Sequence, residues 1–239
     1  MKVTLKRKFI AVLVVILSMA SLLRLLKIAI ITSSSPLSSV LLAKHSKSFP
    51  ILTLKEHKFL DGIISSRAPC NLLIFGNEKQ YFKMGIRNKG GLTIFLDDNV
   101  RYNTFAKDAY KLLKHGRSKK ACFPQNYGFD LRKSRCKLAL TNLPTRVYEV
   151  TWDVIVVDGP CGHLPDCPGR MATIYTAGVL ARKGNVDNAT HVIVHDADRM
   201  IEKWFSWEFL CEDNFISSKG KFWNFGVVGR PNSTMFCAA

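Results

Sequence analysis

The sequence predicts an α/β protein with a mostly parallel sheet and helices on both faces, preceded by one N-terminal transmembrane helix. Three observations support this prediction. Four short, continuously apolar runs rich in β-branched residues have the pattern of strands buried on both faces, as strands of a parallel sheet are. Helix-like stretches alternate with these runs, which is typical of right-handed β–α–β units in a doubly wound sheet. The chain also begins with basic residues followed by an apolar stretch.

The first 51 residues have the pattern of a membrane anchor followed by a linker. The apolar stretch is long enough to cross a bilayer only if Arg24 and Lys27 extend their side chains to the membrane surface. Basic residues before the stretch favour a cytoplasmic N-terminus. A cleaved signal peptide is the alternative, because Ser18-Met19-Ala20 offers small residues for cleavage. The predicted division is a cytoplasmic tail at 1–8, a signal-anchor at 9–31, a stem at 32–51 and a lumenal domain at 52–239.

Both alternatives send the domain into the secretory pathway, and two other features agree with a lumenal address. The sequons Asn188-Ala189-Thr190 and Asn232-Ser233-Thr234 would accept N-linked glycans there. Some of the seven cysteines would pair in an oxidising lumen, and their odd number leaves at least one without an intramolecular partner. Cys122 and Cys136 flank a loop-like stretch and could close it. The cysteine spacings do not resemble a zinc site, and the sequence predicts no metal-ligating residues.

The elements of the domain follow one another from residue 52. A helix over Leu52–Ser66 is expected to lead directly into the first strand. The predicted strands are Asn71–Phe75, Leu92–Leu96, Asp153–Val157 and His191–Val194. Further helices are predicted over Asn99–Lys114, Pro168–Arg182 and Arg199–Cys211, with a proline in the first turn of the second. The alternating segment Phe215–Val228 is expected to close the sheet with antiparallel strands.

The net charge of +17 is concentrated in two places. One is the N-terminal segment, where a basic bias is explained by membrane topology. The other is residues 101–137, which hold eleven basic and two acidic residues. This region is either a solvated helix face with its loop or a surface that attracts a polyanion. A lumenal address argues against nucleic acid and favours an acidic polysaccharide as that polyanion.

Polar residues gather where the four predicted strands end, which is where ligands bind in open α/β sheets. Gly76 either brings the backbone close to a ligand or starts a tight turn. Asp97 either binds a ribose diol or caps a helix, and for its neighbour Asp98 the cap is favoured. Asp158 follows the third strand. His195-Asp196 follows the fourth, and a histidine beside a carboxylate serves either as a general base or as a structural residue.

Eight motifs resemble, in order and spacing, a plant family of polysaccharide-biosynthesis proteins. That family contains glucuronoxylan 4-O-methyltransferases, arabinogalactan glucuronic acid methyltransferases and irregular-xylem proteins of xylan synthesis. The resemblance covers about Leu52 to Phe225 and is closer to the irregular-xylem branch. The motifs are Asn71–Gly76, Gly90–Asp98, Cys136–Leu140, Trp152–Pro160, Pro168–Met171, Tyr175–Arg182, His195-Asp196 and Glu208–Cys211.

The resemblance implies a Rossmann-like, class I methyltransferase fold that uses S-adenosylmethionine. It implies that Phe75-Gly76 approaches the methionine part of this cofactor. Asp97 would bind the ribose hydroxyls, and Asp158 would lie beside the methyl group. The implied acceptor is the 4-hydroxyl of a glucuronic acid side chain on xylan or a similar acidic glycan.

Methyl transfer to a hydroxyl also needs a base and a cation. Asp158, His195 and Asp196 are the candidates for the base. Arg170 or Arg199 could form a fork with the uronate carboxylate.

The family implies a single-pass Golgi membrane protein with its domain in the lumen, acting on glucuronoxylan beside other xylan-synthesis proteins. One motif departs from the family. Methyltransferases of the family continue the first strand with Gly-Leu-Gly-His-Asp-Ser, whereas this chain has Gly76-Asn-Glu-Lys-Gln-Tyr81. Glu78 replaces the second glycine and Gln80 the acidic residue. The alternative function is therefore a non-catalytic xylan-biosynthesis or scaffold factor that retains the methyltransferase fold.

Overall fold

The computed structural model describes Met19 and the residues of a folded unit that spans Ile51–Ala239. Within that unit it describes residues 52–76, 78–96, 100, 102–124, 130–184, 186–230 and 233–237. Apart from Met19, the predicted tail, signal-anchor and stem lie outside the described residues. No helix among the described residues has the length and apolar character needed to cross a membrane.

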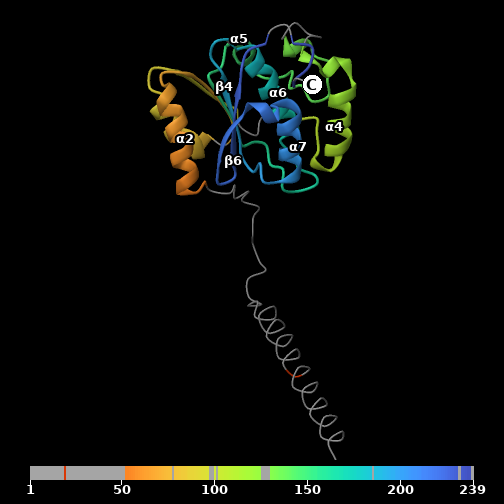
Figure 1. The fold of residues 1–239 in the computed structure, drawn as a ribbon, viewed down its shortest axis with the longest axis horizontal. Coiled ribbons are helices and arrows are strands. Elements are labelled where there is room, and N and C mark those ends of the chain that lie inside the picture. The colour runs from red at the N-terminus through yellow and green to blue at the C-terminus, as the bar shows by residue number, and fades with distance from the viewer. Residues whose placement is uncertain are drawn as a thin grey trace, which may run out of the picture. The chain divides into compact units, whose positions relative to one another are not determined.

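A sheet forms the centre of the folded unit (Figure 1). It has six strands in the order β2-β1-β3-β4-β6-β5. The first four strands in this order are parallel, and β6 and β5 add an antiparallel edge. The predictions of a mostly parallel sheet and of antiparallel closing strands are therefore confirmed. The strands are β1 (Asn71–Phe75), β2 (Leu92–Leu96), β3 (Val154–Val157), β4 (Thr190–Val194), β5 (Phe215–Lys219) and β6 (Phe222–Val227).

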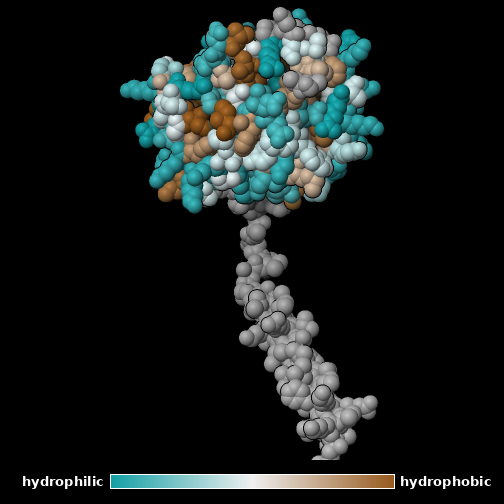
Figure 2. Space-filling model, in the orientation of Figure 1, coloured by the Kyte–Doolittle hydropathy of each residue, from teal (hydrophilic) through white to brown (hydrophobic). Residues whose placement is uncertain are grey.

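Helices cover both faces of the sheet, because alternate residues of each parallel strand point to opposite sides. On β1, Leu72 and Ile74 pack in one apolar cluster with helices α2 (Leu54–Arg67) and α3 (Glu78–Arg87). Leu73 and Phe75 pack in the other cluster. That second cluster contains the buried faces of α4 (Ala109–Ser118), α5 (Thr145–Glu149), α6 (Met171–Arg182) and α7 (Met200–Phe209). Figure 2 shows a mainly hydrophilic outer surface, with apolar side chains in small separate groups on the face in view.

Each predicted helix begins somewhat later than expected, and for two of them the delay is three residues or more. The helix expected from Asn99 begins at Ala109, after a short 3-10 turn η1 (Ala106–Asp108). The amides of Ala106 and Lys107 donate to Cys167 and Pro165 in the loop after β3, and are therefore not available to an earlier helical turn. The helix expected from Pro168 begins at Met171. Gly169 has a φ of +72° and donates its amide to Cys161, so the chain is not yet helical there.

Two helices were not predicted. Helix α3 follows β1 after a break of two residues, and α5 precedes β3. The outer side of α3 carries charged residues together with exposed Phe82 and Ile86. Among its described side chains, Tyr81 and Met84 are the large ones buried against the sheet. Short 3-10 turns complete the connections at η2 (Lys120–Cys122), η4 (Leu131–Lys133) and η5 (Glu212–Asn214).

Three disulfides tie the connections to the core. They join Cys122 to Cys136, Cys161 to Cys167 and Cys211 to Cys237. The predicted closure of the loop between Cys122 and Cys136 is confirmed. The odd cysteine is Cys70, which is buried at the start of β1. Burial raises the pKa of the Cys70 thiol to about 11, so it stays protonated at neutral pH.

Candidate functional site

The strand order reverses between β1 and β3, because β2 lies outside β1 on one side and β4 lies outside β3 on the other. In open α/β sheets the crevice at such a switch point, at the carboxyl ends of the strands, is where ligands bind. The strand tips meet closely here. The amides of Asp158 and Gly159 both donate to the Phe75 carbonyl, at 2.8 and 2.7 Å. A Cβ on Gly159 would lie 3.3 Å from the Gly76 backbone, so glycine at 159 allows this approach.

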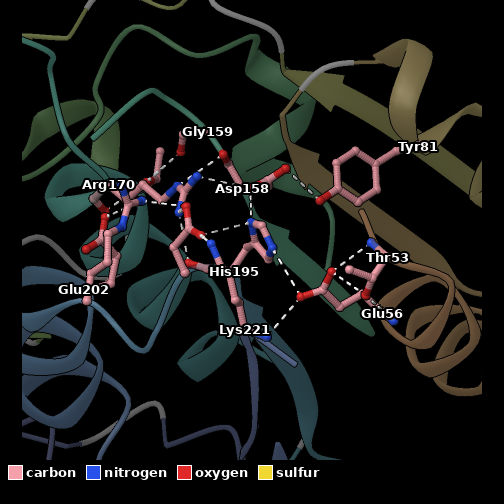
Figure 3. Close-up of polar contacts among 12 residues, drawn as sticks. Thr53, Glu56, Tyr81, Asp158, Gly159, Arg170, His195, Glu202 and Lys221 are labelled. Atoms are coloured by element: carbon pink, nitrogen blue, oxygen red, sulfur yellow. Dashed lines mark hydrogen bonds and ion pairs between the residues drawn. The ribbon is translucent and has the colours of Figure 1, made fainter. Parts of the chain in front are cut away.

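The Asp158 carboxylate at the tip of β3 is held from three sides (Figure 3). The Tyr81 hydroxyl donates to Oδ2 at 2.8 Å. His195 Nδ1 lies 2.6 Å from Oδ1, and Arg170 Nη2 donates to the same oxygen at 3.0 Å. Burial, followed by the nearby Asp158 charge, raises the pKa of Tyr81 well above its ordinary value. Tyr81 is therefore a neutral donor, and both Asp158 oxygens are engaged inside the protein.

His195 follows β4 and Asp158 follows β3, and because these parallel strands are neighbours their ends bring the two side chains together. The His195 side chain is only 3% exposed and packs on the Phe222 ring at a centroid distance of 4.5 Å. With Nδ1 against a carboxylate, the neutral imidazole carries its proton on Nδ1 and its lone pair on Nε2. Nε2 has no hydrogen-bond partner among the residues that the structure describes. The Glu56 Oε1 oxygen lies 3.6 Å from it (Figure 3).

Glu56 belongs to this site, and the sequence analysis did not identify it. It is buried in the first turn of α2, where it forms a capping box with Thr53. Thr53 donates to its Oε2 oxygen, and the Lys221 amide donates to Oε1, the oxygen that faces His195, at 2.9 Å. Burial alone would raise the pKa of Glu56, but hydrogen bonds from Lys221 and Thr53 outweigh it and hold that pKa below its usual range. The pattern Thr-x-x-Glu was the available signal, although it indicates a helix start and not a site.

Arg170 lies between the two acidic strand ends. Its Nη1 donates to Asp196 Oδ2 at 2.7 Å and to the His195 carbonyl at 2.9 Å. Its Nε and Nη2 donate to the Asp158 carbonyl and carboxylate at 3.0 Å. The guanidinium is 5% exposed, and all three of its nitrogens have partners inside the protein. Arg170 thus joins the tips of β3 and β4, and its expected contact with a substrate carboxylate remains a prediction.

Asp196 is the second acid bound by Arg170, and its φ of 54° turns the chain sharply at the end of β4. Burial would raise the pKa of Asp196, but the Arg170 charge and further cationic neighbours lower it to about 2. Arg199 Nη2 adds a contact at 2.6 Å and also reaches Glu202 at 3.0 Å. Arg199 is 29% exposed, so it is more accessible to a ligand than Arg170.

Of the other predicted site residues, Phe75 and Gly76 lie at the end of β1, among the described residues. The Phe75 side chain is fully buried in the core, so only its backbone reaches the site. Gly76 lies at the switch point. Asp97 and Asp98 lie outside the described residues, so the expected ribose contact remains a prediction. Asp158, His195 and Asp196 come close enough for their polar atoms to reach a single metal ion. Arg170 already supplies a fixed positive charge to both acids there.

Comparison with known proteins identifies the relatives of this chain. The family model IRX15/IRX15L/GXM matches residues 55–225. Arabinogalactan O-methyltransferase 2 of Arabidopsis thaliana is 33% identical over 83% of this chain and 74% of its own length. Glucuronoxylan 4-O-methyltransferase 3 of the same plant is 35% identical, over 76% of this chain and 68% of its own. Protein IRREGULAR XYLEM 15 of Arabidopsis thaliana is 39% identical, over 76% and 63%.

No solved structure matches this chain. The resemblance noted in the sequence is confirmed over most of the folded unit, because the matched residues run from α2 into β6. The chain belongs to the IRX15/IRX15L/GXM family.

Proposed function

We propose that this protein transfers a methyl group from S-adenosylmethionine to a hydroxyl of glucuronic acid side chains on xylan or a related acidic cell-wall glycan. The observation that carries the proposal is the switch point between β1 and β3, where Gly76 faces Asp158 and Gly159. Methyl transfer to arabinogalactan or glucuronoxylan is the activity named for several relatives.

A nucleoside cofactor would bind at the strand tips of this switch point, where Gly76 allows the backbone a close approach. The Phe75–Gly76 backbone ends β1 there, and a Cβ at residue 76 would press on the Tyr81 ring at 3.3 Å and on Asp158 at 3.4 Å. Gly76 and, from the second strand, Asp97 would hold the cofactor. When bound, S-adenosylmethionine supplies a methyl group on a positively charged sulfur. The protein's main task is then to align the acceptor hydroxyl with that methyl group.

Of the three candidate bases, His195 suits the reaction best. Both Asp158 oxygens already have donors, and a pKa of about 2 makes Asp196 a weak base at neutral pH. Asp158 holds Nδ1 of His195, which leaves Nε2 to take the hydroxyl proton. Because Nε2 is buried and faces Glu56, acceptor binding must displace the Glu56 carboxylate. Asp158 then stabilises the imidazolium that forms.

The acidic glycan would be held by exposed cations. Arg199 is the accessible arginine beside the strand tips. On and after α4, Lys119 and Lys137 lie close enough to His115 to lower its pKa, after the larger effect of burial. Both lysines are exposed. The loop after β3 is bonded to η1, so this basic segment begins next to the site, and it supports an acidic polysaccharide as the partner.

The non-catalytic alternative is favoured by one observation. Tyr81 stands where the methyltransferases of the family have serine, and its fully buried ring fills the space beside Gly76. Its hydroxyl also binds Asp158, at 2.8 Å. A large side chain here would keep the fold intact while narrowing the approach to the strand tip. In that case the protein would act in xylan synthesis as a binding or scaffold factor.

We further propose a single-pass Golgi membrane protein with the folded unit in the lumen, beside other xylan-synthesis proteins. The three disulfides support an oxidising compartment. The basic and apolar N-terminal sequence supports the anchor. A fluorescent fusion that co-localises with Golgi markers, and loses them when residues 1–31 are deleted, would be the expected result. Cytosolic fluorescence of the intact fusion would contradict this location.

The function is tested by titrating the unit Ile51–Ala239 with S-adenosylmethionine in a calorimeter. We expect saturable heat that disappears in Asp97→Ala. His195→Gln should retain binding but lose about 10²–10⁴-fold in methyl transfer to glucuronoxylan oligosaccharides, because it removes the base. His191→Gln is the matched control, since His191 lies at the opposite end of β4. Absence of binding at millimolar cofactor would favour the scaffold alternative.

A further inference from the structure

A polar hollow of about 610 Å³ lies at the amino ends of β1, β3 and β4. Because the strands are parallel, this end is opposite the strand tips that form the candidate site. The sequon Asn188-Ala189-Thr190 runs along its edge and leads into β4. The functional site makes no use of this sequon.

Asn188 has the exposure that a glycan acceptor needs. Its side chain lies on the surface, and Asn188 helps to line the hollow. Its carbonyl oxygen accepts a hydrogen bond from Arg67 Nη1 at 3.2 Å. No hydrogen bond from its amide nitrogen is made to any residue that the structure describes. A glycan on this nitrogen would therefore extend over a polar, open surface and would break no internal contact.

Thr190, which completes the sequon, is in the opposite situation. It is 2% exposed, and its hydroxyl donates to the Trp152 carbonyl at 2.7 Å. Its backbone lies between β3 and β6, opposite Val227 on the latter. An enzyme that reads Asn-x-Thr has to reach this hydroxyl. The glycosylating enzyme can therefore recognise the sequon only before β4 joins the sheet.

We infer that Asn188 carries an N-linked oligosaccharide, which is attached before the sheet closes over Thr190. In this step Asn188 Nδ2 bonds to the anomeric carbon of a lipid-linked oligosaccharide diphosphate. The bond from that carbon to the diphosphate oxygen breaks, the diphosphate leaves with the electron pair, and the amide loses one proton. The inference rests on the proposed lumenal location, which the three disulfides support independently of the sequon.

The test uses the full chain made in a eukaryotic secretory host. Peptide N-glycosidase in heavy-oxygen water converts a glycosylated asparagine to labelled aspartate, which mass spectrometry locates. We expect the label at Asn188, and a faster-migrating band for Asn188→Gln before the digestion. Asn185→Gln, an equivalent change outside any sequon, should migrate like wild type. Asn232→Gln reports separately on the second sequon.

An unlabelled Asn188 overturns the inference, whether Asn232 is labelled or not. S-adenosylmethionine binding is measured on the same preparations to separate the two proposals. Binding without a glycan at Asn188 refutes only the modification, and a glycan without binding refutes only the methyl transfer. Asn188→Gln should bind the cofactor as wild type does, because it lies at the other end of the sheet. Dithiothreitol during synthesis delays disulfide formation, so it should leave the occupied fraction of Asn188 unchanged or higher. A lower fraction contradicts attachment before folding.

Discussion

Replacing Arg170 by methionine should destabilise the fold more than any other single charge removal at the site. The methionine keeps most of the side-chain length but removes the cation between Asp158 and Asp196. Those carboxylates are 11% and 6% exposed, and Arg170 itself is 5% exposed. Removing one partner of a buried ion pair costs about 3–5 kcal/mol, because the other charge stays buried without compensation. Both acids lose their shared cation, although Asp196 keeps Arg199 and Asp158 keeps Tyr81 and His195. We therefore expect a loss within that range.

The assay is equilibrium unfolding in urea with the disulfides intact, followed by tryptophan fluorescence. Arg87→Met is the matched control, since Arg87 pairs with Asp61 at 2.9 Å but is 62% exposed. An exposed pair contributes about 0–1 kcal/mol, so this variant should unfold almost like wild type. If Arg170→Met lost no more than Arg87→Met, Arg170 would not be what holds the tips of β3 and β4 together.

Three further predictions concern the same fold. Tyr81→Phe should lower the free energy of unfolding by about 1.5–3 kcal/mol, because it removes a donor to the charged Asp158; an unchanged urea midpoint would contradict the bond. The folded-state pKa of Asp196 is about 2 and its unfolded value about 3.9. The ionised Asp196 therefore stabilises the fold by about 2–3 kcal/mol, and this stabilisation is fully present above about pH 4 and lost as the pH falls through about 2. In Asp196→Asn the free energy of unfolding should no longer fall over this pH range for this reason. Changing both Cys122 and Cys136 to serine should cost about 3 kcal/mol, and an unshifted melting temperature would refute it.

The parallel strands could be predicted almost residue by residue. Asn71–Phe75 and Leu92–Leu96 are strands with the expected bounds, because short apolar and β-branched runs between turn-forming residues favour strands. The late start of α4 could not be predicted in this way. It depends on hydrogen bonds from Ala106 and Lys107 to a loop more than fifty residues away, and local propensity contains no information about them.

The same distinction applies to the candidate site. The gathering of Asp158, His195 and Asp196 follows from the topology, since the carboxyl ends of neighbouring parallel strands lie at one edge. The inward turn of Arg170 does not follow from topology, because it depends on two buried acids competing with solvent for the guanidinium. Glu56 reaches the site through the Lys221 amide, 165 residues further along the chain. Its sequence context indicates only the start of a helix.

The central claim is that the switch point between β1 and β3 binds the methyl donor. Hydrogen–deuterium exchange with and without S-adenosylmethionine tests it most directly. We predict slower amide exchange on cofactor addition in peptides covering residues 75–81 and 157–160, and no change around the hollow beside Asn188. Protection at that hollow, or none anywhere at saturating cofactor, would contradict the claim.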